Sequence, residues 1–179
     1  MPINTNSFKE FFILIMGPIF QVLARLLLVT IFKNDIKMIN IYHLSILSFN
    51  LMPIYPLDGG KLLNIVLEKI LPLKKSLKLV IQISFYTTIT IFLIKEKKIN
   101  IIVMTILLVV LIIKENKLIN YKYNRFLLER YLNNYNFKKT KIISTKNDFY
   151  KDRKHLVKDN DIYYYEKEYL EKIMQKSWL

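Results

Sequence analysis

Four long apolar segments limit what this sequence can fold into. They cover residues 11–32, about 39–67, 77–94 and 99–113. The first is long enough to cross about 30 Å of hydrocarbon as a helix. Hydrophobic residues make up 53% of the chain, which is more than a soluble domain of this length needs. We therefore predict an all-α polytopic membrane protein with about four transmembrane segments.

The sequence changes character after the fourth segment. Residues 114–136 predict a helix that either continues that segment into water or lies along the membrane surface. Residues 137–179 predict a small polar α/β appendage with a short strand at 141–145, a hairpin turning at 159–161 and a helix from Glu166. The expected division is a membrane-embedded core (1–113), a juxtamembrane helix (114–136) and a small cytoplasmic C-terminal segment (137–179).

The net charge of +14 could indicate either nucleic acid or a membrane surface as a partner. No nucleic-acid-binding motif accompanies the lysines, and the lysines flank the apolar segments. We therefore expect membrane lipid as a partner and no nucleic acid. The short loops on the two sides carry equal numbers of basic residues, and those that follow residue 113 favour a cytoplasmic C-terminus. The chain has no cysteine, which excludes disulfides and thiolate metal sites.

The second apolar segment is interrupted by "NLMPIYPLDGG", residues 50–60. Pro53 and Pro56 prevent a continuous helix here, because each lacks an N–H group and disfavours helix in the residue before it. Backbone that leaves a helix at membrane depth is tolerated where it lines a cavity in the protein. The interruption therefore predicts a functional cavity.

Asp58 is the acidic residue within this interruption. A helix that restarts there would place the carboxylate at its N-terminus, where the helix dipole favours negative charge. By this reasoning alone Asp58 is either a functional residue or the cap of an interrupted transmembrane helix. Gly59 and Gly60 permit a sharp turn or the close approach of another backbone.

The stretch "NLMPIYPLDGGKLL" resembles the Asn-x-x-Pro-x-x-Pro-Leu-Asp-Gly-Gly signature of the site-2 protease family of zinc intramembrane metalloproteases. "FKEFFILIMGPIFQ" upstream and "RFLLERY" downstream look like the sporulation branch of that family, so the resemblance covers about residues 8–135. It implies an enzyme that cleaves a membrane-tethered protein, such as the precursor of a sporulation sigma factor. It also implies a location in the bacterial cytoplasmic or forespore-surrounding membrane.

The resemblance also implies roles for individual residues. Asp58 corresponds to the aspartate that completes a Zn²⁺ site with two histidines of an upstream His-Glu-x-x-His helix. Three protein ligands leave the fourth position to a water that the metal acidifies. Asn50 matches a polar position that contacts substrate or orients the site, with helix packing as the alternative. The other signature residues shape the motif: Pro53, Pro56, Gly59 and Gly60.

The sequence departs from the family because it contains no His-Glu-x-x-His, and thus no general-base glutamate. We expect His43 to be a buried hydrogen-bonding residue and His155 to be solvated, so neither replaces the lacking ligands. We expect Arg25 to snorkel toward the interface rather than to pair with Asp58. The branch's C-terminal nucleotide-sensing domain is at best a remnant here.

The chain as given is therefore expected to be inactive alone, and three explanations stay open. The active protein is longer, because the start is misassigned or the gene is broken. A separate chain supplies the lacking helices; a regulatory membrane partner is the alternative to such a chain as a protein partner. Or the protein is a non-catalytic relative, a pseudoprotease or membrane subunit that binds helices without cleaving them.

Overall fold

The computed structural model describes residues 4, 7–94, 98–133, 135, 137, 139–159 and 162–177. These residues form a mainly helical chain with a small sheet near the C-terminus. The elements in order are α1 (Ser7–Ile31), a short 3₁₀ turn (Lys33–Asp35), α2 (Ile36–Asn50), α3 (Asp58–Ile70), α4 (Leu73–Ile94), α5 (Ile99–Leu132), β1 (Thr140–Ile143), β2 (Lys154–Asp159), β3 (Ile162–Tyr165) and α6 (Glu166–Ser177).

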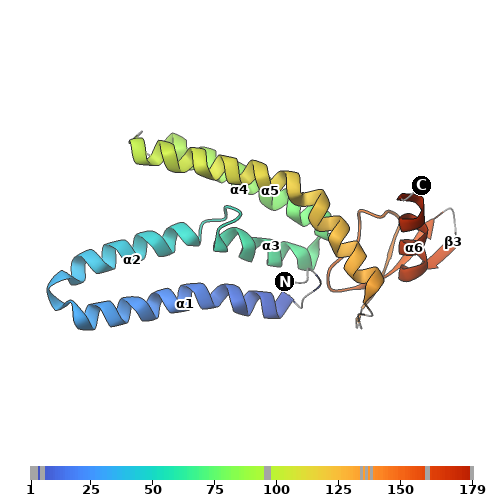
Figure 1. Cartoon of the computed structure of the whole chain (residues 1–179), viewed down its shortest axis with the longest axis horizontal. Helices are drawn as coiled ribbons and strands as arrows, with labels where there is room; N and C mark the ends of the chain where they lie inside the picture. The colour runs from blue at the N-terminus through green and yellow to red at the C-terminus, as the bar shows by residue number, and fades with distance from the viewer. Residues whose placement is uncertain are drawn as a thin grey trace.

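The helices form two antiparallel hairpins (Figure 1). In the first, α1 packs against α2, and α3 follows α2 and packs against the N-terminal half of α1. In the second, α4 packs against α5, and α4 also contacts α3. The C-terminal segment lies at the far end of α5, on the same side of the molecule as the beginning of α1 (Figure 1).

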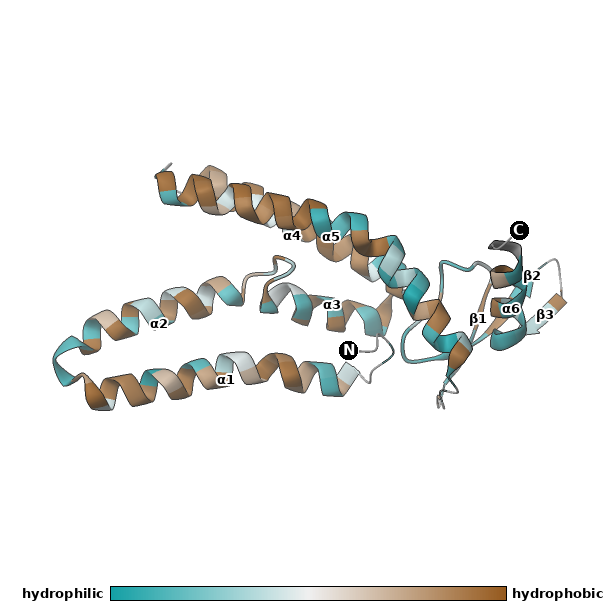
Figure 2. Cartoon of the chain, in the orientation of Figure 1, coloured by the Kyte–Doolittle hydropathy of each residue, from teal (hydrophilic) through white to brown (hydrophobic). Residues whose placement is uncertain are grey.

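Three helices within the described ranges, α1, α4 and α5, are long and apolar enough to cross a membrane. Apolar residues cover most of their length (Figure 2). The structure does not confirm a fourth continuous span, because the second apolar segment is divided between α2, with 15 residues, and α3, with 13. The two prolines lie between these helices, as expected from their effect on helix geometry.

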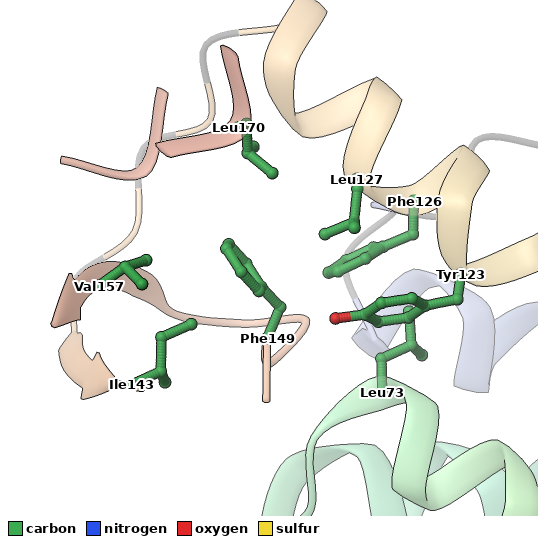
Figure 3. Close-up of a cluster of buried hydrophobic side chains, with 8 residues drawn as sticks. All are labelled: Leu73, Tyr123, Phe126, Leu127, Ile143, Phe149, Val157 and Leu170. Atoms are coloured by element: carbon green, nitrogen blue, oxygen red, sulfur yellow. The ribbon is translucent and has the colours of Figure 1, made fainter. Parts of the chain in front are cut away.

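The α5 helix runs unbroken from the fourth apolar segment to Leu132. Its second half packs on the C-terminal segment, where β1 pairs parallel with β2, and β2 pairs antiparallel with β3. The predicted strand, hairpin and terminal helix are thus confirmed, whereas the turn residues Asn160 and Asp161 lie outside the described residues. A buried cluster joins α4, α5, the sheet and α6 (Figure 3): Leu73, Tyr123, Phe126, Leu127, Ile143, Phe149, Val157 and Leu170.

His155 is fully buried, so the prediction that it is solvated was wrong. Its Nε2 accepts the backbone N–H of Tyr150 at 3.0 Å, and its Nδ1 lies 3.2 Å from the Glu166 carboxylate. Arg130 donates to the same carboxylate at 2.7 Å. Burial lowers the pKa of His155, so the ring is neutral and donates from Nδ1. The prediction was based on the charged residues next to His155 in the sequence; of these, Lys154 is indeed exposed, but the next residue of the strand points the other way.

Candidate functional site

The loop of residues 51–57 connects α2 to α3 and is anchored on α4. Within the loop, the N–H of Leu57 donates to the carbonyl of Ile54 at 2.8 Å. The N–H of Tyr55 donates to Ser84 Oγ of α4 at 2.7 Å. Ile54 is fully buried and belongs to a cluster with four residues of α4 and α5: Ile81, Leu108, Ile112 and Ile119. The interrupted backbone is thus held by polar and apolar contacts to the second hairpin.

Gly59 and Gly60 lie where the first turn of α3 meets this loop. A Cβ added to Gly59 would lie 2.2 Å from the carbonyl oxygen of Leu51, and one added to Gly60 would lie 2.5 Å from the backbone of Ile54. Both distances are far below any ordinary carbon contact. Of the two uses expected for these glycines, the structure therefore shows the close approach of another backbone.

Asp58 is the first residue of α3, and its side chain is 29% exposed. Its Oδ1 pairs with Nζ of Lys61 at 3.3 Å, one turn further along the helix. On the other side α1 passes close by, because a Cβ added to Gly17 would lie 3.4 Å from Oδ2 of Asp58. The carboxylate is thus held between the end of the loop and the backbone of α1.

Of the other candidate residues, Asn50 lies at the start of the loop, whereas Arg25 and His43 make their contacts within the α1–α2 hairpin. Asn50 is the last residue of α2, where the loop begins, and it is half-buried. Arg25 donates from Nε to Oδ1 of Asn40 in α2 at 2.8 Å, a contact that the sequence did not predict. His43 accepts a hydrogen bond from Gln21 Nε2 at its backbone carbonyl, at 3.3 Å.

A zinc site requires at least three protein ligands that converge on one point. Over the described ranges of the chain, no three His, Cys, Asp or Glu side chains form a group that could hold a metal ion. Asp58 offers carboxylate oxygens, but its neighbour Lys61 is a cation and not a ligand. The described residues therefore do not fit a complete zinc site, and we derive no reaction step through the metal.

A cavity of about 540 Å³ lies beside Lys61, bounded by α1, α3, α4, α5 and the C-terminal segment. Its walls are mainly apolar, with several polar groups: Glu10, Tyr55, Lys61, Asn64, Glu68, Lys122, Arg125 and Lys151. Lys151 bonds to Glu10 at 2.5 Å and to Glu68 at 3.1 Å. Sequence reasoning missed this group, because no motif joins three charged residues so far apart in the chain.

The profile of peptidase family M50 matches residues 32–94, a range that contains α2, the loop, α3 and α4. Stage IV sporulation protein FB of Bacillus subtilis (strain 168) is 34% identical to this chain over 133 residues. The chain is related to the site-2 protease family. The alignment covers 69% of this chain and 46% of the Bacillus protein, so the chain spans about half the length of the curated protein that it matches. The relationship predicted from the signature is thus confirmed.

Proposed function

We propose that this chain is part of an intramembrane zinc metalloprotease and that Asp58 supplies one of the zinc ligands. The main support is the position of the carboxylate, at the N-terminus of α3 and next to the backbone of α1 at Gly17. The relationship to peptidase family M50 supports a metalloprotease reaction. In this proposal the His-Glu-x-x-His residues come from outside these 179 residues, either from preceding sequence or from a separate chain.

The proposal includes a placement in the membrane. The α2 helix, the loop and α3 together make a fourth, broken crossing, which brings Asp58 to membrane depth. The C-terminal segment lies on the cytoplasmic side, because basic residues are concentrated after residue 113. The substrate is a membrane-tethered protein, and Asn50 at the beginning of the loop contacts it.

Bound zinc would supply an acidified water for peptide hydrolysis. The residues of this chain have separate tasks. Asp58 would hold the metal, and the loop that precedes it is anchored to α4 through Tyr55 and Ser84. The ammonium group of Lys61 would compete with a bound cation for Asp58, because it already pairs with Oδ1 and like charges repel.

The Asp58–Lys61 ion pair also favours a second candidate function. It balances the charge of Asp58 without any metal, as a non-catalytic relative would require. Such a pseudoprotease or membrane subunit would bind helices at the same site and cleave nothing.

Zinc analysis of purified protein separates the two functions. The first step is to translate the DNA upstream of Met1 and in neighbouring genes, and to co-express any His-Glu-x-x-His segment with the chain. We expect one zinc per complex, lost in Asp58→Asn and kept in the control Asp35→Asn. The chain alone should bind no stoichiometric zinc.

Three outcomes would decide against the proposal. Stoichiometric zinc on the chain alone would show that its own residues complete the site. Zinc that persists in the Asp58→Asn complex would remove Asp58 from the ligand set. If no such segment is encoded in that DNA, the non-catalytic function is favoured instead.

A further inference from the structure

The loop between β1 and β2 docks the C-terminal segment onto the ends of the membrane helices. The backbone carbonyl of Phe149 accepts the N–H of Leu73 at 3.0 Å, and the Phe149 ring points into the buried cluster that Leu73 also enters (Figure 3). Asp148 pairs with Lys75 of α4 at 2.9 Å, and Asp152 accepts from Ser7 of α1 at 2.9 Å. This loop therefore contacts the beginnings of α1 and α4 together.

Lys151 extends from the centre of this docking loop to two carboxylates on different helices. Its ammonium group lies 2.5 Å from Glu10 Oε2 of α1 and 3.1 Å from Glu68 Oε2 of α3. The side chains of Lys151 and Glu68 are only 3% and 4% exposed, and that of Glu10 is 20% exposed. Burial alone would lower the pKa of Lys151, but the two carboxylates outweigh it and hold the pKa above its ordinary value.

The backbone of the docking loop is itself fixed. Arg130 of α5 donates from Nη2 to the carbonyl of Lys151 at 2.7 Å, and its Nη1 donates to Glu166 of α6 at 2.7 Å. The position of the ammonium group therefore depends on the folded state of the whole C-terminal segment.

The three charged groups of Lys151, Glu10 and Glu68 lie along the same α1–α3 contact as Asp58. Glu10 and Gly17 are seven residues apart, so they lie on one face of α1, about 10 Å apart along its axis. Glu68 and Asp58 are ten residues apart on α3, or about 15 Å. The α1 and α3 helices thus meet at two places, through Lys151 at one end and through Gly17 and Asp58 at the other.

We propose that Lys151 is a latch by which the C-terminal segment holds α1 against α3 and so positions Gly17 beside Asp58. Without the ammonium group, Glu10 and Glu68 would lose the cation that lies between them, and the buried Glu68 carboxylate would lose the charge that balances it. Undocking the C-terminal segment withdraws the cation and lets the two helices separate. This inference relies on the proposed protease function only for its consequence at Asp58.

Thiol crosslinking in the full-length chain tests the latch, because the native sequence has no cysteine. The reporter pair is Leu14→Cys on α1 and Ile65→Cys on α3, two residues that line the same cavity. We expect Lys151→Met to slow crosslinking of this pair by about tenfold or more, as removal of one partner from a buried ion group leaves uncompensated charge. The control Lys154→Met removes an exposed lysine of the same segment and should have no effect.

A second variant distinguishes a latch from simple packing. Lys151→Met with Glu68→Gln removes the uncompensated charge, and the new amide can bond to Asn64, whose Oδ1 is buried without a partner among the described residues. We expect this double variant to restore crosslinking. A second reporter pair, Ile81→Cys with Leu108→Cys between α4 and α5, should crosslink equally in all variants.

Each other outcome would overturn the latch. Unchanged α1–α3 crosslinking in Lys151→Met would show that the cation does not hold the helices. Failure of the Glu68→Gln rescue would make the role of Lys151 one of packing. Loss of both reporter pairs would show that Lys151 supports the whole fold. None of these measurements needs zinc or substrate, so a failed zinc experiment leaves this test intact.

Discussion

Two arginines show how different the surroundings of a charged side chain are at the contact of α5 with the C-terminal segment and in the α1–α2 hairpin. Arg130 is 2% exposed, and its guanidinium bonds to Glu166 and to the carbonyls of Lys151 and Arg153. Arg25 is only half-buried and bonds to the amide of Asn40, on a helix whose apolar window is 0% buried within the chain. The contact between α5 and the C-terminal segment encloses its polar groups, whereas the α1–α2 hairpin leaves most of its apolar surface exposed.

The largest expected effect on stability comes from replacing Arg130 by methionine, with Arg25 replaced in the same way for comparison. Arg130→Met leaves the Glu166 carboxylate buried without its cation and should destabilise the C-terminal segment by about 3–5 kcal/mol. Arg25→Met removes one hydrogen bond between membrane helices and should cost about 1 kcal/mol or less. Protease protection of the segment and of the hairpin, measured in detergent, checks both values. Equal losses in the two variants would contradict the contrast between the two regions.

A smaller effect is expected where the hairpin meets the anchored loop. Gly59→Ala places a Cβ 2.2 Å from a backbone oxygen and should cost about 1–3 kcal/mol, because the loop has to shift. Gly17→Ala is the matched control, since its Cβ would make an ordinary 3.4 Å contact with Asp58. Thermal unfolding of the two variants gives the comparison. A Gly59→Ala protein as stable as Gly17→Ala would show that the loop is loosely held.

The smallest effect is a pH dependence confined to the C-terminal segment. His155 has a lowered pKa in the fold because of burial, whereas an unfolded histidine titrates near about 6.5. As the pH falls below about 6.5, the unfolded chain gains a proton before the folded chain does, so stability falls by at most about 1.4 kcal/mol per pH unit. The loss stops once the pH is below the folded pKa, and above about 6.5 the stability is fully present.

Hydrogen exchange of the Tyr150 amide, which donates to Nε2 of His155, measures this loss locally. Exchange should be faster at pH 5 than at pH 7 after correction for the intrinsic rate. Exchange of amides in the α4–α5 hairpin near Leu108 is the internal control and should show no such change. Unchanged protection of the Tyr150 amide would mean that His155 has the same pKa in the folded and in the unfolded chain.

The sequence was most informative about features that depend on the backbone of a few neighbouring residues. Pro53 and Pro56 predicted the break between α2 and α3, which is observed. Gly59 and Gly60 predicted either a sharp turn or a close backbone contact, and the structure shows the close contact. The turn residues at 159–161, between "HLV" and "IYYY", likewise predicted the hairpin of β2 and β3. These features depend on residues within a few positions of one another, so a pattern can reveal them.

Contacts between distant residues could not be read in this way. The burial of His155 depends on Arg130 and Glu166, and neither pairing leaves a periodic signal in the sequence. The same holds for Lys151, whose two carboxylate partners are 141 and 83 residues away. At the candidate site, the family signature identified Asp58. The approach of Gly17 to Asp58 depends on how α1 packs on α3, which the signature does not contain.

The unequal lengths of α4 and α5 determine how the chain reaches the C-terminal sheet. The α5 helix has 34 residues and its hairpin partner α4 has 22, so α5 is longer by about 18 Å at 1.5 Å per residue. Because α5 is continuous, its second half extends past the beginning of α4 and carries the chain to the sheet, and the loop between β1 and β2 then returns to Leu73. The C-terminal segment is thus joined to the beginning of α4 twice, covalently through α5 and non-covalently through this loop, so the two connections close a ring around the buried cluster.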